Sequence, residues 1–352
     1  MADICNHQSR SINPGIITIV GPTASGKSSL AVALAQYLES VILGADSRQI
    51  YKHFTIGTAK PSMDDRLSVP HELIDICEPT DNFTVSEFQA QACDRIHHWH
   101  AQQVIPLLVG GTGLYIKSIV RGLKIPKVPS QPQLRLQLTH LDRRYRWQLL
   151  AQVDPQSASA IHPNDDIRTT RALEVFYTTG QAISKLQGES PPPYPILQIG
   201  IDCLDSISTA NNVEMQQQLL NHKVAKTAKT PSDDRLFRRI QQRTSSMFAA
   251  GFVEEVSSLV QTYGQELPLF QTLGYREVLD ALQGKSTIAE AEQLTALHTR
   301  QFAKRQRTWF RADPTICWLD ADDPNLLAHA KTLVDQFLDS THERCDNFAQ
   351  CS

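Results

Sequence analysis

The segment Gly21–Ser28 constrains this chain more than any other stretch of its sequence. It reads GPTASGKS and fits the pattern G-x-x-x-x-G-K-[ST]. An apolar, β-rich run at 16–20 precedes it, and helical periodicity follows it from 28 to 40. A glycine-rich loop between a strand and a helix turns backbone N–H groups, and the positive end of the helix dipole, toward a phosphate. The context therefore predicts a phosphate-binding loop on an α/β fold rather than a chance glycine-rich turn.

Eight residues of this loop are predicted to bind the phosphate groups of a di- or triphosphate: Gly21, Pro22, Thr23, Ala24, Ser25, Gly26, Lys27 and Ser28. Lys27 supplies a positive charge, and the Ser28 hydroxyl can ligate Mg²⁺. The motif predicts that a di- or triphosphate binds. It leaves open which one binds and whether a phosphoryl group moves.

Strands and helices alternate along the first third of the chain. Besides the run at 16–20, apolar runs at 41–45, 73–77 and 105–109 predict strands, and the spacing at 84–102 predicts a helix. Such alternation is typical of βαβ units. We therefore expect a P-loop NTPase-like core, with a parallel sheet flanked by helices.

The alternation breaks after Gly122, where three prolines precede a stretch with helical periodicity only. Three more prolines at 191–193 close this stretch, and 196–201 reads as a strand that returns to the sheet. We therefore expect the first part of the core at 14–123, a helical insertion at 124–194 and the second part of the core at 195–330. In that second part we expect a polar loop or loose helix at 204–232, helices at 235–263, 275–282 and 287–311, and an edge strand at 316–319, followed by a flexible tail at 331–352.

Composition excludes several classes of protein. The 352 residues hold 34 Lys and Arg against 37 Asp and Glu, so any nucleic-acid contact must come from a local basic patch. Apolar runs are only strand-sized, the first residues form no apolar signal, and seven scattered cysteines lack zinc-site spacing. These features favour a cytoplasmic protein with reduced thiols and no membrane contact, and we expect a monomer.

Asp46 directly follows the second predicted strand. Ligands of open parallel sheets bind at the carboxyl ends of the strands, so Asp46 should face the phosphate loop. A carboxylate there could ligate Mg²⁺ through water or accept a proton, but it could equally be the N-cap of a helix.

Basic side chains gather in two places. Arg300, Lys304, Arg307 and Arg311 recur at helical spacing with Arg305 beside them, which indicates a cationic helix face suited to RNA phosphates rather than a merely solvated one. The second cluster lies in the helical insertion and interleaves arginines with aromatic residues that could stack on bases: Arg135, Arg143, Arg144, Tyr145, Arg146 and Trp147.

Short blocks in a fixed order carry a resemblance to a known family. They are GPTASGKS, ADSRQIY, IGTAKP, PHELID, LLVGGTGLYIKS, IHPND with RALE, LGYRE and TRQFAKRQRTWFR. Together, over about residues 14–320, they closely resemble the bacterial tRNA dimethylallyltransferases, also called tRNA isopentenyltransferases or IPP transferases. Three departures stand beside this match: Thr55 replaces a family aspartate, 204–232 is longer than usual, and the zinc finger of eukaryotic relatives is not seen.

The resemblance implies an activity. Family members move a dimethylallyl group from dimethylallyl diphosphate to N6 of the adenosine 3′-adjacent to the anticodon and release diphosphate. By this match Arg243 and Lys27 hold the diphosphate with Mg²⁺ at Ser28, Asp46 is the general base, and Thr112 lies near the reacting amine. Without the match, Arg243 would read as an ordinary helical arginine and Thr112 as a helix N-cap.

The resemblance also implies contacts with the anticodon stem-loop of tRNA. The matching residues are Asp46, Ser47, Arg48, Gln49, Thr112, Ile167, Arg168, Thr169, Thr170, Arg171, Gln271, Thr272, Leu273, Gly274, Tyr275, Arg276, Arg300, Lys304, Arg305 and Arg307.

Three other classes of protein share part of this pattern. An adenylate isopentenyltransferase would prenylate free AMP, ADP or ATP, and the basic clusters argue against it. A nucleoside or shikimate-type kinase would consume ATP. An RNA-binding protein with a vestigial phosphate loop would not need Lys27, Ser28, Asp46 and Arg243 together.

Overall fold

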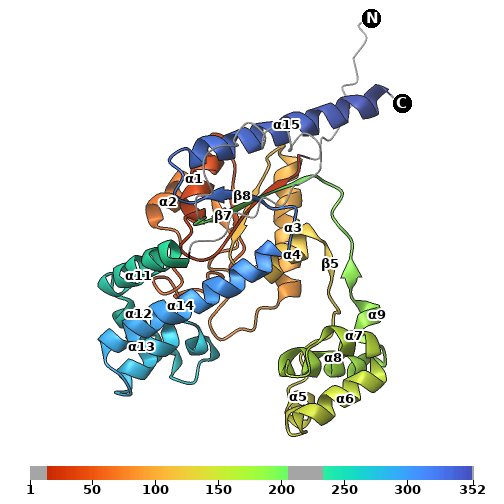
Figure 1. Ribbon diagram of the computed structural model, residues 1–352, viewed down its shortest axis with the longest axis vertical. Helices are drawn as coiled ribbons and strands as arrows, with labels where there is room; N and C mark the ends of the chain where they lie inside the picture. The colour runs from red at the N-terminus through yellow and green to blue at the C-terminus, as the bar shows by residue number, and fades with distance from the viewer. Residues whose placement is uncertain (1–13, 205–232, 351–352) are drawn as a thin grey trace, which may run out of the picture. The chain divides into compact units, whose positions relative to one another are not determined.

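The computed structural model describes residues 14–204 and 233–350 (Figure 1). The chain forms two compact units. The first comprises the residues up to Thr84, Ala90–Ile116 and those from Tyr194 onward, and the second comprises Val85–Gln89 and Lys117–Pro193. Residues 124–193 of the expected helical insertion fall in the second unit. The polar segment expected at 204–232 lies outside the described residues, Leu204 excepted.

A six-stranded sheet forms the centre of the first unit, in the order β3-β2-β4-β1-β7-β8. Every pairing in it is parallel, which confirms the predicted α/β class. All five residues of β1 are buried, as expected for a strand covered on both faces. The strands are β1 (Ile16–Val20), β2 (Ile42–Gly44), β3 (His71–Glu72), β4 (Leu107–Gly110), β7 (Ile196–Asp202) and β8 (Cys317–Asp320).

The third strand is shorter and earlier than the run at 73–77 predicts. Leu73 and Asp75 have φ values of 62° and 58°, in the left-handed region that no β-strand uses. Cys77 is left with a single parallel bridge to Tyr51. The apolar composition of 73–77 indicated burial correctly, but it did not reveal these two backbone turns.

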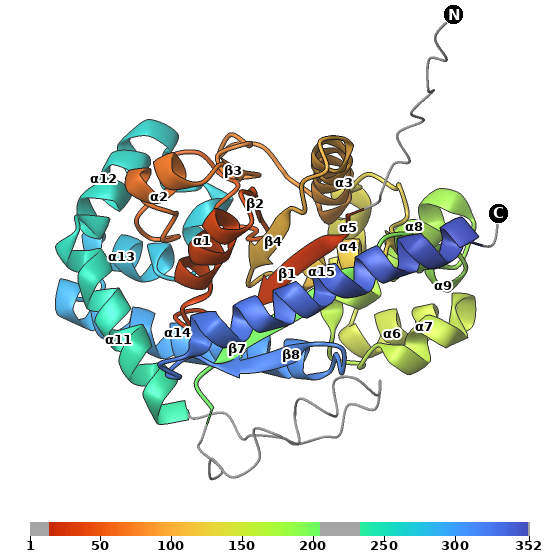
Figure 2. The same ribbon diagram turned by 90° about the horizontal axis from the view of Figure 1, so that it is seen from above.

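Helices α1 (Lys27–Tyr37) and α15 (Leu326–Gln350) pack together against the sheet, and α15 runs across β7 and β8 (Figure 2). Ala330 and Val334 of α15 are fully buried in the core cluster that contains Leu34. The prediction of a flexible tail at 331–352 is therefore wrong for 331–350, because this segment forms a helix whose first turns complete the core.

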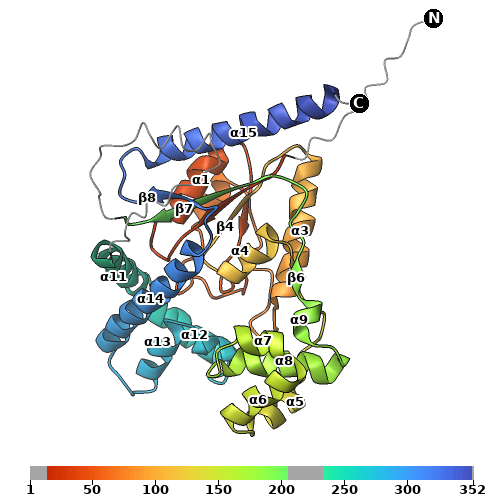
Figure 3. The same ribbon diagram turned by 45° about the vertical axis from the view of Figure 1, so that its right-hand side comes forward.

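Four further helices gather at one end of the first unit (Figure 3). They are α11 (Asp233–Ala249), α12 (Phe252–Tyr263), α13 (Tyr275–Leu282) and α14 (Ile288–Arg311), with a short 3₁₀ turn at Pro268–Gln271. Phe252 and Tyr275 anchor a cluster that also holds Phe54, from the loop after β2. The first unit also contains α2 (Met63–Ser68) and most of α3 (Val85–Ala101).

The second unit is mainly helical (Figure 1). Its own small core includes Leu150 and Leu173, both fully buried. Its elements are α5 (Pro132–Thr139), α6 (Arg143–Val153), α7 (Pro155–Ala160), α8 (Asp166–Thr179) and α9 (Ile183–Leu186), with an antiparallel pair of β5 (Leu123–Lys124) and β6 (Gly188–Glu189). Helix α4 (Gly113–Val120) begins in the first unit and ends in the second. None of the described helices is long and apolar enough to cross a membrane.

Candidate active site

The phosphate loop lies at the carboxyl end of β1, between the ends of β4 and β7. Gly21 has a φ of 146°, and a Cβ there would lie 2.1 Å from the carbonyl oxygen of Ile201, so only glycine fits. Gly26 has a φ of 92° and leads directly into α1. These two glycines let the loop turn tightly over the first turn of the helix. The amide groups of that turn have no partner within the helix and can bind an anion.

The Lys27 ammonium is turned inward, where its Nζ donates to the carbonyl oxygen of Pro22 at 2.6 Å. Burial, followed by the positive charge of Arg243, lowers the pKa of Lys27 to about 7, although Asp46 and Asp202 oppose the change. Arg243, on α11, also has a pKa lowered by burial and partly restored by Asp46. Lys27, Arg243 and Asp46 therefore share one electrostatic neighbourhood, and its two cations would be stabilised by an anionic ligand.

Asp46 follows β2 and forms a turn. Its Oδ1 accepts the backbone N–H of Arg48 at 2.9 Å, and no helix begins there, so the N-cap interpretation is wrong. Thr112 directly precedes α4, and its Oγ1 accepts the N–H of Ser47 at 2.9 Å. Its carbonyl also accepts the N–H of Ile116, the first bond of α4. Thr112 therefore occupies the cap position and fixes the loop that carries Asp46.

The residues near the loop fit a magnesium ion that is held mainly by a bound diphosphate. Ser28 is exposed on the first turn of α1, and the Asp46 carboxylate lies near enough to Lys27 to affect its pKa. Among the described residues no three His, Cys, Asp or Glu side chains converge on one point. Mg²⁺ commonly binds through one or two protein oxygens, phosphate oxygens and water, so this donor set is adequate.

The predicted basic stripe on α14 does not form one open face. Lys304 and Arg305 are exposed, and the Arg300 guanidinium lies 4.7 Å from the centre of the Phe237 ring. Arg307, however, is only 6% exposed and donates to Asp202 from Nε at 2.9 Å and from Nη2 at 2.8 Å. The prediction that Arg307 offers a surface contact to tRNA is therefore wrong, because the helix turns it toward an acidic residue at the end of β7.

The guanidinium of Arg311, the last residue of the stripe, lies 3.9 Å from the centre of the Trp318 ring. Its Nη2 is 3.6 Å from Oδ2 of Asp202. Sequence reasoning missed Asp202 itself. The signal was available, since Asp202 ends a strand at the carboxyl edge just as Asp46 follows one.

Burial also divides the residues expected from LGYRE. Gln271 and Arg276 are exposed, whereas Gly274 and Tyr275 are buried. The Tyr275 hydroxyl donates to Glu255 at 2.7 Å, and Glu255 also accepts the backbone N–H groups of residues 55–57. The Tyr275 side chain is thus part of the core and does not reach the surface. Thr272 and Leu273 are half-buried.

The second unit shows a similar division. Ile167 and Arg168 are exposed at the start of α8, but Thr169 and Thr170 face the core. Arg171 is half-buried and pairs with Glu174 at 2.6 Å. The surface roles expected of Thr169 and Thr170 are therefore wrong, because they lie on the buried side of α8.

The basic cluster expected in this unit is also divided. Arg143, Arg144 and Tyr145 are exposed, whereas Arg146 is buried and donates to Asp166 at 2.7 Å. Arg135 pairs with the buried Glu174. The Trp147 indole donates to the carbonyl of Ile161 at 3.2 Å, so it packs within the unit. Arg146 is thus wrongly predicted as part of an exposed patch.

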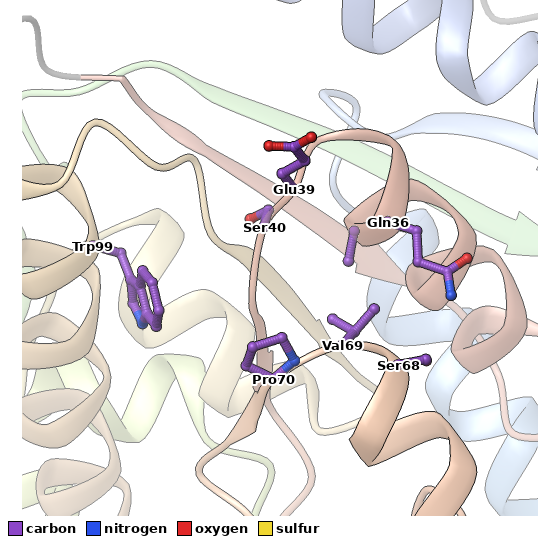
Figure 4. Close-up of a pocket in the computed structure, with 8 residues that line it drawn as sticks. Gln36, Glu39, Ser40, Ser68, Val69, Pro70 and Trp99 are labelled. Carbon is purple, nitrogen blue, oxygen red and sulfur yellow. The ribbon is translucent and has the colours of Figure 1, made fainter.

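A hollow of about 300 Å³ lies elsewhere in the first unit (Figure 4). In its wall, Ser40 lies two residues before β2 and Pro70 directly before β3, so the hollow lies at the amino ends of these strands, opposite the phosphate loop. Its lining contains no cationic side chain: Ala35, Gln36, Glu39, Ser40, Ser68, Val69, Pro70 and Trp99. It lacks the charge that a diphosphate requires.

A parallel sheet that ends in a phosphate loop, with Lys27 and Arg243 beside a carboxylate, defines a phosphate-binding enzyme of the P-loop class. The family model described as "IPP transferase" matches residues 49–217 and 203–313, and that described as "Isopentenyl transferase" matches 14–78. The chain belongs to the IPP transferase family.

Individual relatives agree with this placement. A tRNA dimethylallyltransferase of Picosynechococcus is 53% identical over 321 residues, which cover 91% of this chain and 98% of the relative. That of Gloeothece citriformis is 52% identical over 319 residues, or 91% and 95% of the two chains. The crystal structure of a tRNA isopentenylpyrophosphate transferase from Bacillus halodurans matches with a TM-score of 0.65 and 29% identity, over 94% of this chain and 98% of that one.

Proposed function

We propose that this protein transfers a dimethylallyl group from dimethylallyl diphosphate to N6 of the adenosine immediately 3′ of the anticodon in tRNA, and releases diphosphate. The observation that carries the proposal is the joint position of Lys27, Arg243 and Asp46 beside one phosphate loop. The family membership and the names of the relatives support the donor, the acceptor and the enzyme class.

The chemistry needs opposite charges at two neighbouring points. The allylic C–O bond breaks and its electron pair leaves with the diphosphate, while the N6 lone pair forms the new C–N bond. Lys27, Arg243 and the N–H groups of the loop stabilise the negative charge that grows on the leaving group. Ser28 would hold a Mg²⁺ ion here, and the ion would add positive charge beside the diphosphate oxygens.

The amine must lose a proton as the new bond forms. An exocyclic adenine amine is a weak nucleophile, because its lone pair is delocalised into the ring. Asp46 accepts this proton and orients the amine, with Thr112 holding the same loop in place.

Exposed residues of both units supply the proposed contacts with tRNA. They are Arg48, Ile167, Arg168, Gln271, Arg276, Lys304 and Arg305, together with the half-buried Arg300. The cations contact phosphates of the anticodon stem-loop and fix its register. The protein acts in the cytoplasm as a monomer.

The acceptor distinguishes this function from its rivals. Purified protein is incubated with dimethylallyl diphosphate, Mg²⁺ and either unmodified tRNA or AMP, and the products are weighed by mass spectrometry. The proposal expects a five-carbon addition to tRNA alone, mapped to the adenosine 3′ of the anticodon. Addition to AMP alone would identify an adenylate isopentenyltransferase. In a separate incubation with ATP and no allylic donor, consumption of ATP would identify a kinase.

A further inference from the structure

Helix α14 reaches the proposed active site through one buried side chain, Gln306, which is 6% exposed. Its Oε1 accepts the backbone N–H of Thr23 in the phosphate loop at 2.8 Å. Its Nε2 donates to the carbonyl oxygen of Gly111, in the loop after β4, at 2.9 Å. One amide thus joins two loops that are far apart in the sequence.

The connection continues to the proposed base. Thr112 follows Gly111, and its Oγ1 accepts the N–H of Ser47 at 2.9 Å. Ser47 in turn follows Asp46. A continuous path of covalent and hydrogen bonds therefore leads from the phosphate loop through Gln306 to the loop that carries the carboxylate.

The close fit of α14 against these loops requires two glycines. A Cβ on Gly111 would lie 2.3 Å from Nε2 of Gln306, and a Cβ on Gly113 would lie 2.2 Å from Cδ1 of Trp309. Both distances are well below van der Waals contact, so the backbone of 111–113 is shaped to receive these two side chains.

We propose that Gln306 is a positioning residue for the transfer step, which fixes the distance between the phosphate loop and the loops of Thr112 and Asp46. This inference rests on the proposed function. The allylic carbon is bonded to a diphosphate that the phosphate loop binds, and the amine is bound by the loop that carries Asp46. The reacting atoms must approach to about 3–3.5 Å, and a misplacement of about 1 Å can cost about 100-fold in rate.

Gln306 also determines which N–H groups of the phosphate loop are free to bind the diphosphate. The Thr23 N–H is already hydrogen-bonded to Gln306 and is therefore not available to the diphosphate. Without the Gln306 amide, the Thr23 N–H would be free and the phosphate loop would lose its link to Gly111. Each loop could then move relative to the other and carry its bound substrate with it.

The test replaces the amide without changing the length of the side chain. Gln306→Met removes both hydrogen bonds, and single-turnover transfer is followed with enzyme in excess, saturating dimethylallyl diphosphate and prebound unmodified tRNA. We expect the rate constant to fall by about 10- to 100-fold. The amplitude and the tRNA dissociation constant should stay at their wild-type values.

Gln198 provides a matched control. It is also a buried glutamine, 5% exposed, and its Nε2 donates to Thr315 at 2.5 Å and to Asp313 at 3.5 Å, both of which lie outside the two loops. Gln198→Met should leave the rate constant within about twofold of wild type, since it removes a similar bond away from the site.

The amplitude separates positioning from loss of folded protein. A wild-type rate constant for Gln306→Met, with full or reduced amplitude, would overturn the positioning role, and so would an equal fall for Gln198→Met. Failure of the wild-type protein to prenylate tRNA would instead overturn the proposed function.

Discussion

Lys27 is a residue whose charge depends on what occupies the phosphate loop. Its folded pKa of about 7 lies below the ordinary lysine value of 10.5, so the folded protein binds fewer protons than the unfolded chain between these values. In this window the contribution of Lys27 to the free energy of unfolding therefore rises with pH. A bound diphosphate favours the ammonium and raises its pKa again.

Donor binding should consequently take up protons at alkaline pH. At pH 8 we expect uptake of close to one proton per dimethylallyl diphosphate bound, measured by calorimetry in buffers of different ionisation enthalpy. Lys27→Arg stays charged throughout and is the control for ionisation of the donor itself. Equal proton uptake by the wild type and Lys27→Arg would contradict the assignment.

Arg307 is structural, whereas its neighbour Arg305 is on the surface. Arg307→Met would remove the 2.8 Å ion pair from the fully buried Asp202 carboxylate, while Arg311 would stay at 3.6 Å. Breaking a buried pair from one side costs roughly 3–5 kcal/mol, whereas an exposed change costs within about 0.5 kcal/mol. Urea unfolding of Arg307→Met and Arg305→Met measures the loss in the free energy of unfolding for each variant. Equal stability of the two variants would show that the ion pair with Asp202 contributes little.

At the scale of elements, α15 is part of the core rather than a tail. Val334 is fully buried against β-strand residues and α1, so Val334→Ala should lower the free energy of unfolding by roughly 1.5–3 kcal/mol. Leu327, on the same helix, is 39% exposed, and Leu327→Ala is the control with a smaller expected loss. Thermal and urea unfolding measure the stability of both variants. An unaltered unfolding midpoint for Val334→Ala would mean that the packing of α15 on the sheet does not stabilise the fold.

The elements also show what the sequence could predict and what it could not. Local patterns were sufficient for β1, the phosphate loop and α3, because strand period, glycines and helical spacing are all read within a few residues. They failed at Arg307 and Arg146, whose carboxylate partners Asp202 and Asp166 are distant in the sequence. Asp46 and Thr112 could be singled out, but their link through Ser47 and the Gln306 bridge arise only when the strands assemble.

The whole molecule carries a net charge of −3, so its tRNA contacts depend on a few exposed cations. Each phosphate contact that is lost should reduce the magnitude of the slope of log K against log salt by about 0.7–0.9. We expect Lys304→Glu, in the first unit, and Arg168→Glu, in the second, each to weaken tRNA binding and flatten this slope. Donor affinity should not change. An unchanged slope for either variant would remove that residue from the proposed tRNA surface.

In the proposed reaction, Asp46 receives the proton of the reacting amine beside the diphosphate held by Lys27 and Arg243. Asp46→Asn tests it most directly, because an asparagine can still accept the Arg48 N–H at 2.9 Å and keep the turn, but cannot act as a base. The measurement is single-turnover transfer to prebound tRNA at saturating donor. We expect the rate constant to fall by about 100- to 10,000-fold, with tRNA and donor affinities retained. A rate constant close to that of the wild type would contradict it.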